Sequence, residues 1–316
     1  MKRSHLILLL KALISLGLLA FLFSRIDMGQ LLRVLSLAHP SYLILILLGY
    51  FLGQLISSVR WALLARPLGF RNSLKDFTVY YFIGMFFNLF APSTIGGDVG
   101  RVFYLARGEA KVDGQSWTGP TTCALVSVVA DRTIGMAVLV WMGAMALVMF
   151  PMYSIPWVIR YLTLALALGF VLAWAVLPLL HRFLKRKENS LGKNLGRALE
   201  TFGRNQPIIL QAILLSLVIH LIQAWIQVLL GRALDLEIPW SYSFILYPLV
   251  GLFSALPISL NGIGLREGGY LFLLQKIDVS SEKAIAFGLL WFLIVVLESL
   301  IGGVVFIASR SRSVRR

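Results

Sequence analysis

Six apolar runs of about 20 residues constrain most strongly what this chain can fold into. They cover residues 6–24, 42–59, 129–150, 157–180, 208–230 and 284–308. A helix of this length crosses the hydrocarbon core of a bilayer, where every backbone polar group must be paired within the protein. Because 59% of the residues are apolar and 14% are charged, we predict an all-α polytopic integral membrane protein that forms one unit over residues 1–316.

The basic residues indicate how the chain is oriented. The net charge is +15, but Lys and Arg lie in short blocks between apolar runs, which is typical of cytoplasmic loops rather than of nucleic-acid binding. We place Arg60, Arg66, Arg71 and Lys75 in one such block and expect both termini to be cytoplasmic. A basic amphipathic segment at 181–207 is expected to contact anionic lipid head groups. With one cysteine and four histidines, no disulfide, metal centre or cofactor site is expected.

One short pattern interrupts the apolar sequence twice. It consists of a proline, a glycine five residues later and an arginine four residues after that, and it occurs at 92–101 and 257–266. Helix breakers and charges at such places are typical of the discontinuous helices that form transport sites. The alternative is a chance match between ordinary Pro/Gly turns that join full spans.

The charge distribution gives the two copies opposite topology. The segment 77–105 starts and ends beside cytoplasmic basic blocks, whereas 240–275 starts and ends outside. We therefore predict two oppositely oriented broken or re-entrant hairpins, beside about six full transmembrane helices, with the hairpin tips approaching each other near the membrane midplane. This inverted repeat would have halves at about 1–150 and 151–316.

The composition of the tips favours an anionic ligand. Glycines let backbone amides approach a ligand, and a half-helix that starts at a break directs its free N–H groups toward it. The arginines add forked donors suited to phosphate or carboxylate. The acids beside them either neutralise the arginines or receive a cation or a proton. The candidate substrate-binding residues are Gly96, Gly97, Asp98, Arg101, Asn261, Gly262, Gly264, Arg266 and Glu267.

Four other polar residues inside apolar runs are candidates for gating or coupling. They are Asp131, Arg132, His220 and Glu298. Asp131 and Arg132 form either a snorkelling salt bridge or a gate, and Glu298 lies too deep to be interfacial and needs a partner. His220 belongs to a stripe at helical spacing, for which hydrogen bonding between helices is as good an explanation as a pore lining. The stripe consists of Ser216, His220, Gln223 and Gln227.

Three sequence elements together resemble the lysylphosphatidylglycerol synthase transmembrane, or flippase-like, family over nearly the whole chain. They are Gly96-Gly97-Asp98-x-x-Arg101, Asp131-Arg132-x-x-Gly135 and Asn261-Gly262-Ile-Gly264-Leu-Arg266-Glu267-Gly268. The family more often has Glu at the position of Asp131, a conservative difference that keeps an acid beside an arginine.

This resemblance implies a bacterial or archaeal inner-membrane protein that moves a phospholipid, an aminoacyl-phospholipid or a lipid-linked head group across the membrane. Two-part relatives join such a membrane domain to a soluble aminoacyl-transferase domain. We do not expect that domain in this chain, so no catalytic residue is assigned and lysyl transfer by the chain alone is not expected. The alternatives are a membrane enzyme or enzyme subunit that modifies lipids or lipid-linked sugars, and a scaffold for a separate synthase. A lipid-modifying enzyme is a candidate partner.

Overall fold

The computed structural model describes residues 3–24, 26–90, 96–107, 119–185, 196, 199–256 and 258–313. These residues form helices and no strands, which confirms the predicted all-α membrane fold. Five of the helices are long and apolar enough to cross a bilayer. They are α3 (Pro40–Ala65), α6 (Pro120–Met149), α7 (Trp157–Lys185), α9 (Gln206–Ala233) and α12 (Ser281–Ser313).

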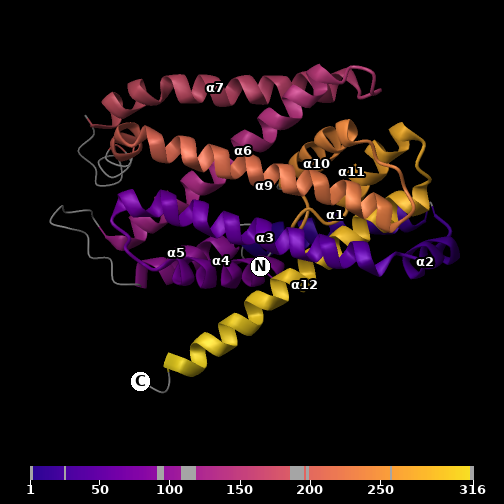
Figure 1. The fold of residues 1–316 in the computed structure, drawn as a ribbon, viewed down its shortest axis with the longest axis horizontal. Coiled ribbons are helices and arrows are strands. Elements are labelled where there is room, and N and C mark those ends of the chain that lie inside the picture. Colours follow the sequence, from indigo (N-terminus) through magenta and orange to yellow (C-terminus); the bar gives the residue numbers. More distant parts are fainter. Residues whose placement is uncertain are drawn as a thin grey trace.

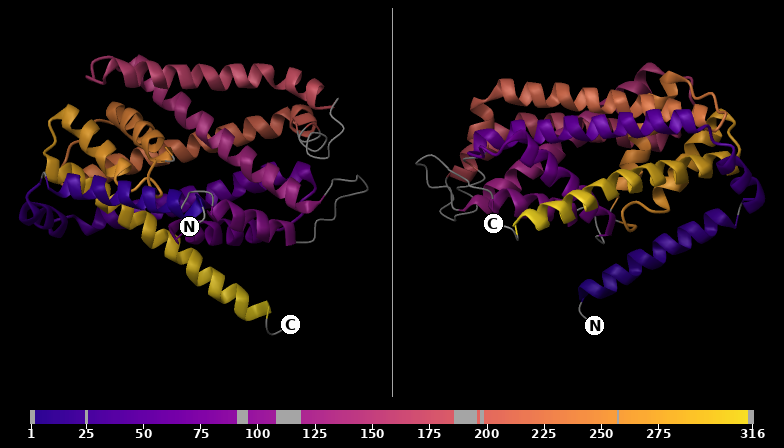
Figure 2. Two further views of the ribbon diagram at one scale, coloured as in Figure 1. Left: turned by 180° about the vertical axis from the view of Figure 1, so that it is seen from behind. Right: turned by 60° about the horizontal axis from the view of Figure 1, so that its bottom comes forward.

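The first apolar run forms α1 (Arg3–Phe23), which is followed by α2 (Met28–Ser36) at an angle of 91°. Asp27 starts α2, because its carboxylate accepts hydrogen bonds from the backbone amides of Gly29 and Gln30 and so caps the free end of the helix. Figure 2 shows α1 at the edge of the bundle, where the hydroxyl of Ser15 accepts a hydrogen bond of 2.9 Å from the amide of Leu260 in the second hairpin. With α1 as the sixth apolar helix, the predicted number of about six spans agrees with the fold.

The outer surface of the bundle is apolar. Large side chains such as Trp157, Val304 and Ile307 are 68–71% exposed on α7 and α12. Contiguous exposed apolar surface of this extent is unfavourable in water but suits lipid, where hydrocarbon chains replace water around the helices. Helices α7 and α12 therefore lie where lipid contact is expected. The second half of α12 also packs on α4 (Leu74–Phe90), because Gly302 lies against the backbone of Phe82 and Gly303 against the ring of Phe86, and the C-terminal end of α12 then extends beyond α4 (Figure 1).

Helices α3 and α9 form the centre of the bundle and run antiparallel. At one end the amide of His39 donates to the carbonyl of Ala233, and near the other end Arg60 donates to Ser216. Gly49 on α3 lets the two helices approach closely, because a Cβ there would be 3.4 Å from Ile226. We call the two ends of the bundle the Pro40 end and the Ala65 end, after the first and last residues of α3.

Two helical hairpins enter the bundle from opposite ends. Helices α4 (Leu74–Phe90) and α5 (Gly96–Arg107) follow α3 at the Ala65 end, and α10 (Trp240–Ala255) and α11 (Leu265–Leu274) follow α9 at the Pro40 end (Figure 1). Each of these four helices is shorter than the roughly 20 residues that a full span requires. The fold therefore contains two oppositely oriented broken hairpins, as predicted.

The element order is repeated along the chain. A long helix, a broken hairpin and another long helix occur first as α3 to α6 and again as α9 to α12. This order supports the predicted repeat, whose halves at 1–150 and 151–316 stay a prediction. The prolines of both motifs, at 92 and 257, lie outside the described residues, and so do residues 186–195, 197 and 198 of the basic segment at 181–207.

Candidate functional site

The tips of the two hairpins contact each other. The side-chain amide of Asn261 donates a hydrogen bond of 2.7 Å to the carbonyl of Asn88, at the end of α4. The side chain of Asn88 in turn accepts one of 2.7 Å from the amide of Gly97, at the start of α5. Both motifs therefore meet through Asn88, a residue that the sequence analysis had not singled out.

The glycines of the motifs serve packing and turning. A Cβ on Gly97 would collide with the carbonyl oxygen of Gly84, so glycine allows α4 and α5 to cross closely. In the second tip Asn261, Gly262 and Gly264 have φ angles of +49°, +75° and +84°, in the left-handed region that glycine tolerates best. Packing and backbone geometry therefore explain these glycines, and the close approach of a ligand to their backbone amides stays a prediction.

Asp131 lies at the centre of a buried charge cluster in the Ala65 half of the bundle. One carboxylate oxygen accepts a hydrogen bond of 2.8 Å from Arg60 on α3, and the other accepts one of 2.8 Å from Arg101 on α5. All three residues are buried, with exposed fractions of 7% or less. The predicted alternative of a snorkelling bridge to Arg132 is not what this carboxylate forms, because both of its oxygens serve arginines from other helices.

Asp98 forms a second, looser part of the cluster. It pairs with Arg132 on α6, whose side chain is 45% exposed, and it lies 3.5 Å from a terminal nitrogen of Arg101. That second distance exceeds the 2.8 Å between Arg101 and Asp131, and one oxygen of Asp98 has no hydrogen-bond partner within the described chain. Asp98 is therefore held less tightly than Asp131.

Aromatic side chains fix the orientation of Arg101. Its guanidinium group lies 4.2 Å from the ring centre of Trp61 and 4.7 Å from that of Tyr81. A cation over the face of an aromatic ring is attracted by the ring quadrupole, most strongly where water is excluded. Trp61 is held in turn by a hydrogen bond of 3.1 Å to Ser127. Arg101 is therefore preorganised before any ligand binds.

A cavity of about 220 Å³ opens beside this cluster, and we call it the arginine cavity. Three arginines and two aspartates line it, so these residues leave one positive charge unbalanced. Its volume is below the roughly 300–1,000 Å³ of pockets that hold drug-sized molecules, which suits a head group better than a whole lipid. The lining residues are Arg60, Tyr81, Gly84, Met85, Asn88, Asp98, Arg101, Asp131, Arg132 and Gly135.

The second motif is closed by an internal ion pair. Arg266 donates two hydrogen bonds, of 2.6 and 3.0 Å, to one oxygen of Glu267, and the other oxygen accepts one of 2.7 Å from the amide of Gly264. Arg266 also stacks on Phe292 of α12. Glu298 lies on the C-terminal side of Phe292 in α12. It is buried, and one of its oxygens has no hydrogen-bond partner among the described residues. The two motifs are therefore not equivalent.

The polar stripe on α9 makes contacts between helices. Ser216 accepts a hydrogen bond of 2.7 Å from Arg60, and Gln227 accepts one of 2.9 Å from Tyr270 on α11. His220 lies 2.9 Å from the carbonyl of Gly135 and 3.1 Å from Tyr247. The stripe therefore connects the arginine cavity to the second hairpin.

Arg60 is the residue of the cavity that sequence reasoning placed wrongly. The charge blocks assigned it to a cytoplasmic loop, but α3 continues to Ala65 and buries it. The helix can continue because Asp131 neutralises the guanidinium. One signal was present in the sequence, since Gln54, Ser57 and Ser58 precede Arg60 in an otherwise apolar run. All three are buried, and they mark the inward face of α3.

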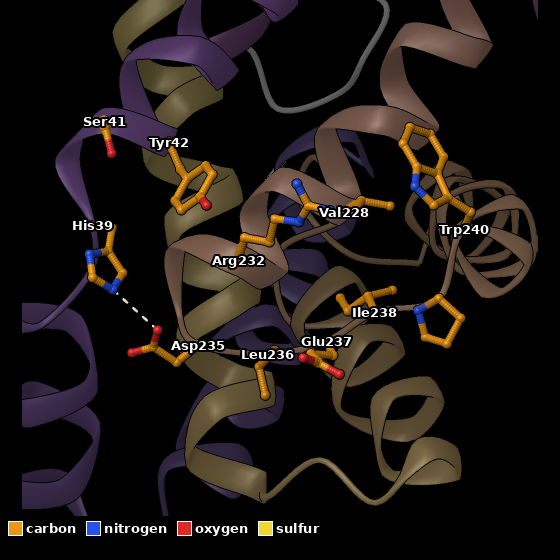
Figure 3. A pocket seen from close by; sticks show the side chains of 11 residues that line it. His39, Ser41, Tyr42, Val228, Arg232, Asp235, Leu236, Glu237, Ile238 and Trp240 are labelled. Atoms are coloured by element: carbon orange, nitrogen blue, oxygen red, sulfur yellow. Dashed lines mark hydrogen bonds and ion pairs between the residues drawn. The ribbon is translucent and has the colours of Figure 1, made fainter.

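A larger cavity of about 900 Å³ lies at the Pro40 end, and we call it the far cavity. The start of α3 and the end of α9 form it, with Trp240 at the start of α10. Figure 3 shows the pair between His39 and Asp235, 3.1 Å apart, with Arg232 pointing away from Asp235. Arg232 is exposed and makes no ion pair within the described part of the chain. Glu237 adds a second carboxylate.

Comparison with known proteins agrees with the motifs. The family described as the lysylphosphatidylglycerol synthase TM region matches residues 8–303. UPF0104 membrane protein MJ1595 of Methanocaldococcus jannaschii is 27% identical over 137 residues, which are 43% of this chain and 37% of that protein. The match thus spans less than half of that relative. Because the family covers almost all of residues 1–316, this chain belongs to the lysylphosphatidylglycerol synthase transmembrane-region family.

Proposed function

We propose that this chain moves a phospholipid or lipid-linked head group between the two leaflets of its membrane, with the head-group phosphate bound in the arginine cavity. The observation that supports this most directly is the cavity itself, which opens within a membrane helix bundle beside buried charges and carries an excess of one positive charge. Buried ionisable groups are unfavourable in a membrane unless they have a function or a partner. A phosphodiester carries the matching single negative charge.

Asp98 is the group that the phosphate would displace. Its oxygen beside Arg101 lies 3.5 Å from the guanidinium and has no hydrogen-bond partner among the described residues, whereas Asp131 is held at 2.8 Å by two arginines. A phosphate oxygen that replaces Asp98 beside Arg101 would form a charge-assisted hydrogen bond there, while Asp98 keeps its pair with Arg132, so the phosphate neutralises the cluster and Asp131 stays at its structural centre. Asp98 would then close the cavity again when the head group leaves.

Arg101 provides the test of this proposal. In liposomes that contain the purified protein and an acyl-labelled fluorescent phosphatidylglycerol, bleaching by external dithionite measures transfer between leaflets. Arg101→Gln should slow protein-dependent transfer by about tenfold to a hundredfold, because it removes a charge-assisted contact with the phosphate. Arg107→Gln, on the exposed end of the same helix, should leave the rate unchanged.

Two outcomes would contradict the proposal. The first is wild-type protein that transfers no labelled lipid above empty vesicles across several anionic head groups. The second is an Arg101→Gln protein that remains folded by circular dichroism and transfers lipid as fast as the wild type. Mass spectrometry of the recovered lipid separates transport from enzymatic modification, since transport leaves the lipid mass unchanged.

The far cavity fits a role at the opposite membrane face. Tyr42 and Arg60, which line the two cavities, are 18 residues apart on α3, or about 27 Å along the helix axis. The hydrocarbon core of a bilayer is about 30 Å thick. Trp240 and Tyr42 are residue types that are enriched at the membrane–water interface. We therefore place the second position of the head group in the far cavity, near Arg232.

Arg232→Gln tests that second position. It should slow transfer of labelled phosphatidylglycerol by about threefold to tenfold, less than Arg101→Gln, because Arg232 is exposed and its contact with phosphate competes with water. The same dithionite assay measures the effect. Lys276→Gln, which removes a positive charge from the short 3-10 helix that follows α11 (Gln275–Ile277), at the same end of the bundle, serves as the control. Equal rates for Arg232→Gln and wild type would exclude the far cavity from the route.

A further inference from the structure

The polar stripe on α9 lies between the two motifs and is almost completely buried. Its four residues are 0–7% exposed and extend from Ser216 to Gln227. Those 11 residues correspond to about 16 Å along the helix, roughly half of the hydrocarbon core. Ser216 contacts Arg60 of the arginine cavity, and Gln227 contacts Tyr270 in the helix that begins with the second motif.

Two polar atoms of the stripe are unpaired. The side-chain oxygen of Gln223 and the side-chain nitrogen of Gln227 have no hydrogen-bond partner within the described residues. Both side chains are at least nine-tenths buried. An unpaired polar group in the protein interior loses its water without compensation, so such groups are rare unless a water molecule or ligand completes them. The two atoms lie one helical turn apart on the same face.

The chemistry of the two atoms selects the kind of group that fits. The oxygen of Gln223 needs a donor, and the nitrogen of Gln227 needs an acceptor. A hydroxyl group is both, whereas an ammonium group can only donate. Room for about one methyl-sized group, such as a single hydroxyl, exists beside Gln223, because Gly53 of α3 has no side chain and a Cβ there would be in ordinary contact, 3.6 Å from the Gln223 nitrogen.

We propose that Gln223 and Gln227 bind the hydroxyl groups of a lipid head group, such as glycerol or a sugar, as it passes from the arginine cavity toward the second hairpin. This inference rests on the proposed lipid transport and adds the class of head group. The stripe contains no carboxylate, lysine or arginine, so it offers hydrogen bonds without holding the phosphate. A head group with hydroxyls would be transported faster than one that carries only an ammonium group.

The first experiment compares two acyl-labelled lipids in the dithionite assay, phosphatidylglycerol and phosphatidylethanolamine. Gln227→Leu should slow transfer of phosphatidylglycerol by about threefold to tenfold, the value of one or two hydrogen bonds, and leave transfer of phosphatidylethanolamine unchanged, because an ammonium group cannot accept a hydrogen bond. Gln223→Leu should slow transfer of both lipids, because an ammonium group can also donate to the Gln223 oxygen. Gln206→Leu, at the exposed start of the same helix, is the matched control and should change neither rate.

The second experiment does not depend on transport. In a Cys123→Ser background, which removes the one native cysteine, Gln223→Cys should react with a small water-soluble methanethiosulfonate reagent. Vesicles that contain phosphatidylglycerol should slow the reaction more than vesicles of phosphatidylethanolamine. Leu221→Cys, on the exposed face of α9, should react poorly because its thiol lies in lipid.

These results distinguish the inference from the proposed function. If Arg101→Gln slows transfer but Gln227→Leu slows both lipids equally, or neither lipid, the inference is overturned and lipid transport stands. A Gln223→Cys protein that does not react would also overturn it. Wild-type protein that transfers neither lipid would overturn both proposals together.

Discussion

Asp131→Ala is expected to lower the free energy of unfolding by about 3–5 kcal/mol, the largest effect of any single substitution considered for this protein. The carboxylate neutralises Arg60 and Arg101, both of them buried. Its loss leaves Arg60 without a carboxylate and Arg101 with Asp98 at 3.5 Å, and the penalty for burying these charges exceeds the value of any single hydrogen bond. Unfolding of the purified protein in detergent, followed by circular dichroism, measures the change.

Two further variants separate loss of charge pairing from loss of packing. Glu237→Ala removes an exposed acid and should change the stability by less than about 0.5 kcal/mol. A triple variant, Asp131→Leu with Arg60→Met and Arg101→Met, should recover most of the stability, because apolar residues of similar volume often replace a buried charge cluster without loss. It should nevertheless transfer no lipid. An Asp131→Ala protein as stable as wild type would show that the cluster is not structural.

The sequence predicted the spans and the hairpins because both depend on local properties. The length of an apolar run decides whether it can cross the bilayer, and the basic blocks indicate which loops lie on the same side of the membrane. Those two rules together placed 77–105 and 240–275 in opposite orientations, and the structure confirms the two hairpins at opposite ends of the bundle. The contact between their tips followed from that inversion.

The partners within the arginine cavity could not be predicted in this way. Arg60 is close in sequence to Arg66 and Arg71, and a rule based on charge near span ends treats them alike. Its burial depends on Asp131, 71 residues later. The pairing of Arg60 with Asp131 depends on how α3 and α6 pack, and a local sequence pattern does not predict that packing. The same reason explains why the looser pair of Asp98 with Arg101 could not be distinguished from the tight pair at Asp131.

The contacts of the motif glycines could not be predicted from local sequence either. Gly97 and Gly268 each lie in the first turn of a half-helix and near a motif arginine, so their sequence contexts look alike. The backbone of Gly97 contacts α4, whereas the space beside Gly268 is open within 4 Å. A sequence identifies where a glycine interrupts an apolar run, but the surface that the glycine faces depends on the fold.

That difference makes Gly97→Ala the second prediction with a large effect. A Cβ at this position would meet the carbonyl oxygen of Gly84 and the side chain of Asn88. Overpacking of this kind typically costs about 1–3 kcal/mol, and the upper end is expected because a backbone carbonyl cannot rotate away as a side chain can. The displaced Asn88 would also lose its contact with Asn261, so the two tips would separate.

Gly268→Ala is the matched control, since it adds the same methyl group in an equivalent first turn with no atom within 4 Å. It should raise the free energy of unfolding by about 0.5–1 kcal/mol, because alanine is the better helix former. Thermal unfolding of both variants in one detergent, together with the dithionite assay, tests the pair. Gly97→Ala should be the less stable variant and should slow lipid transfer, because Asn88, Asp98 and Arg101 all line the arginine cavity and move with α4 and α5. A Gly97→Ala protein at least as stable as Gly268→Ala would mean that the two half-helices do not cross as closely as their glycines indicate.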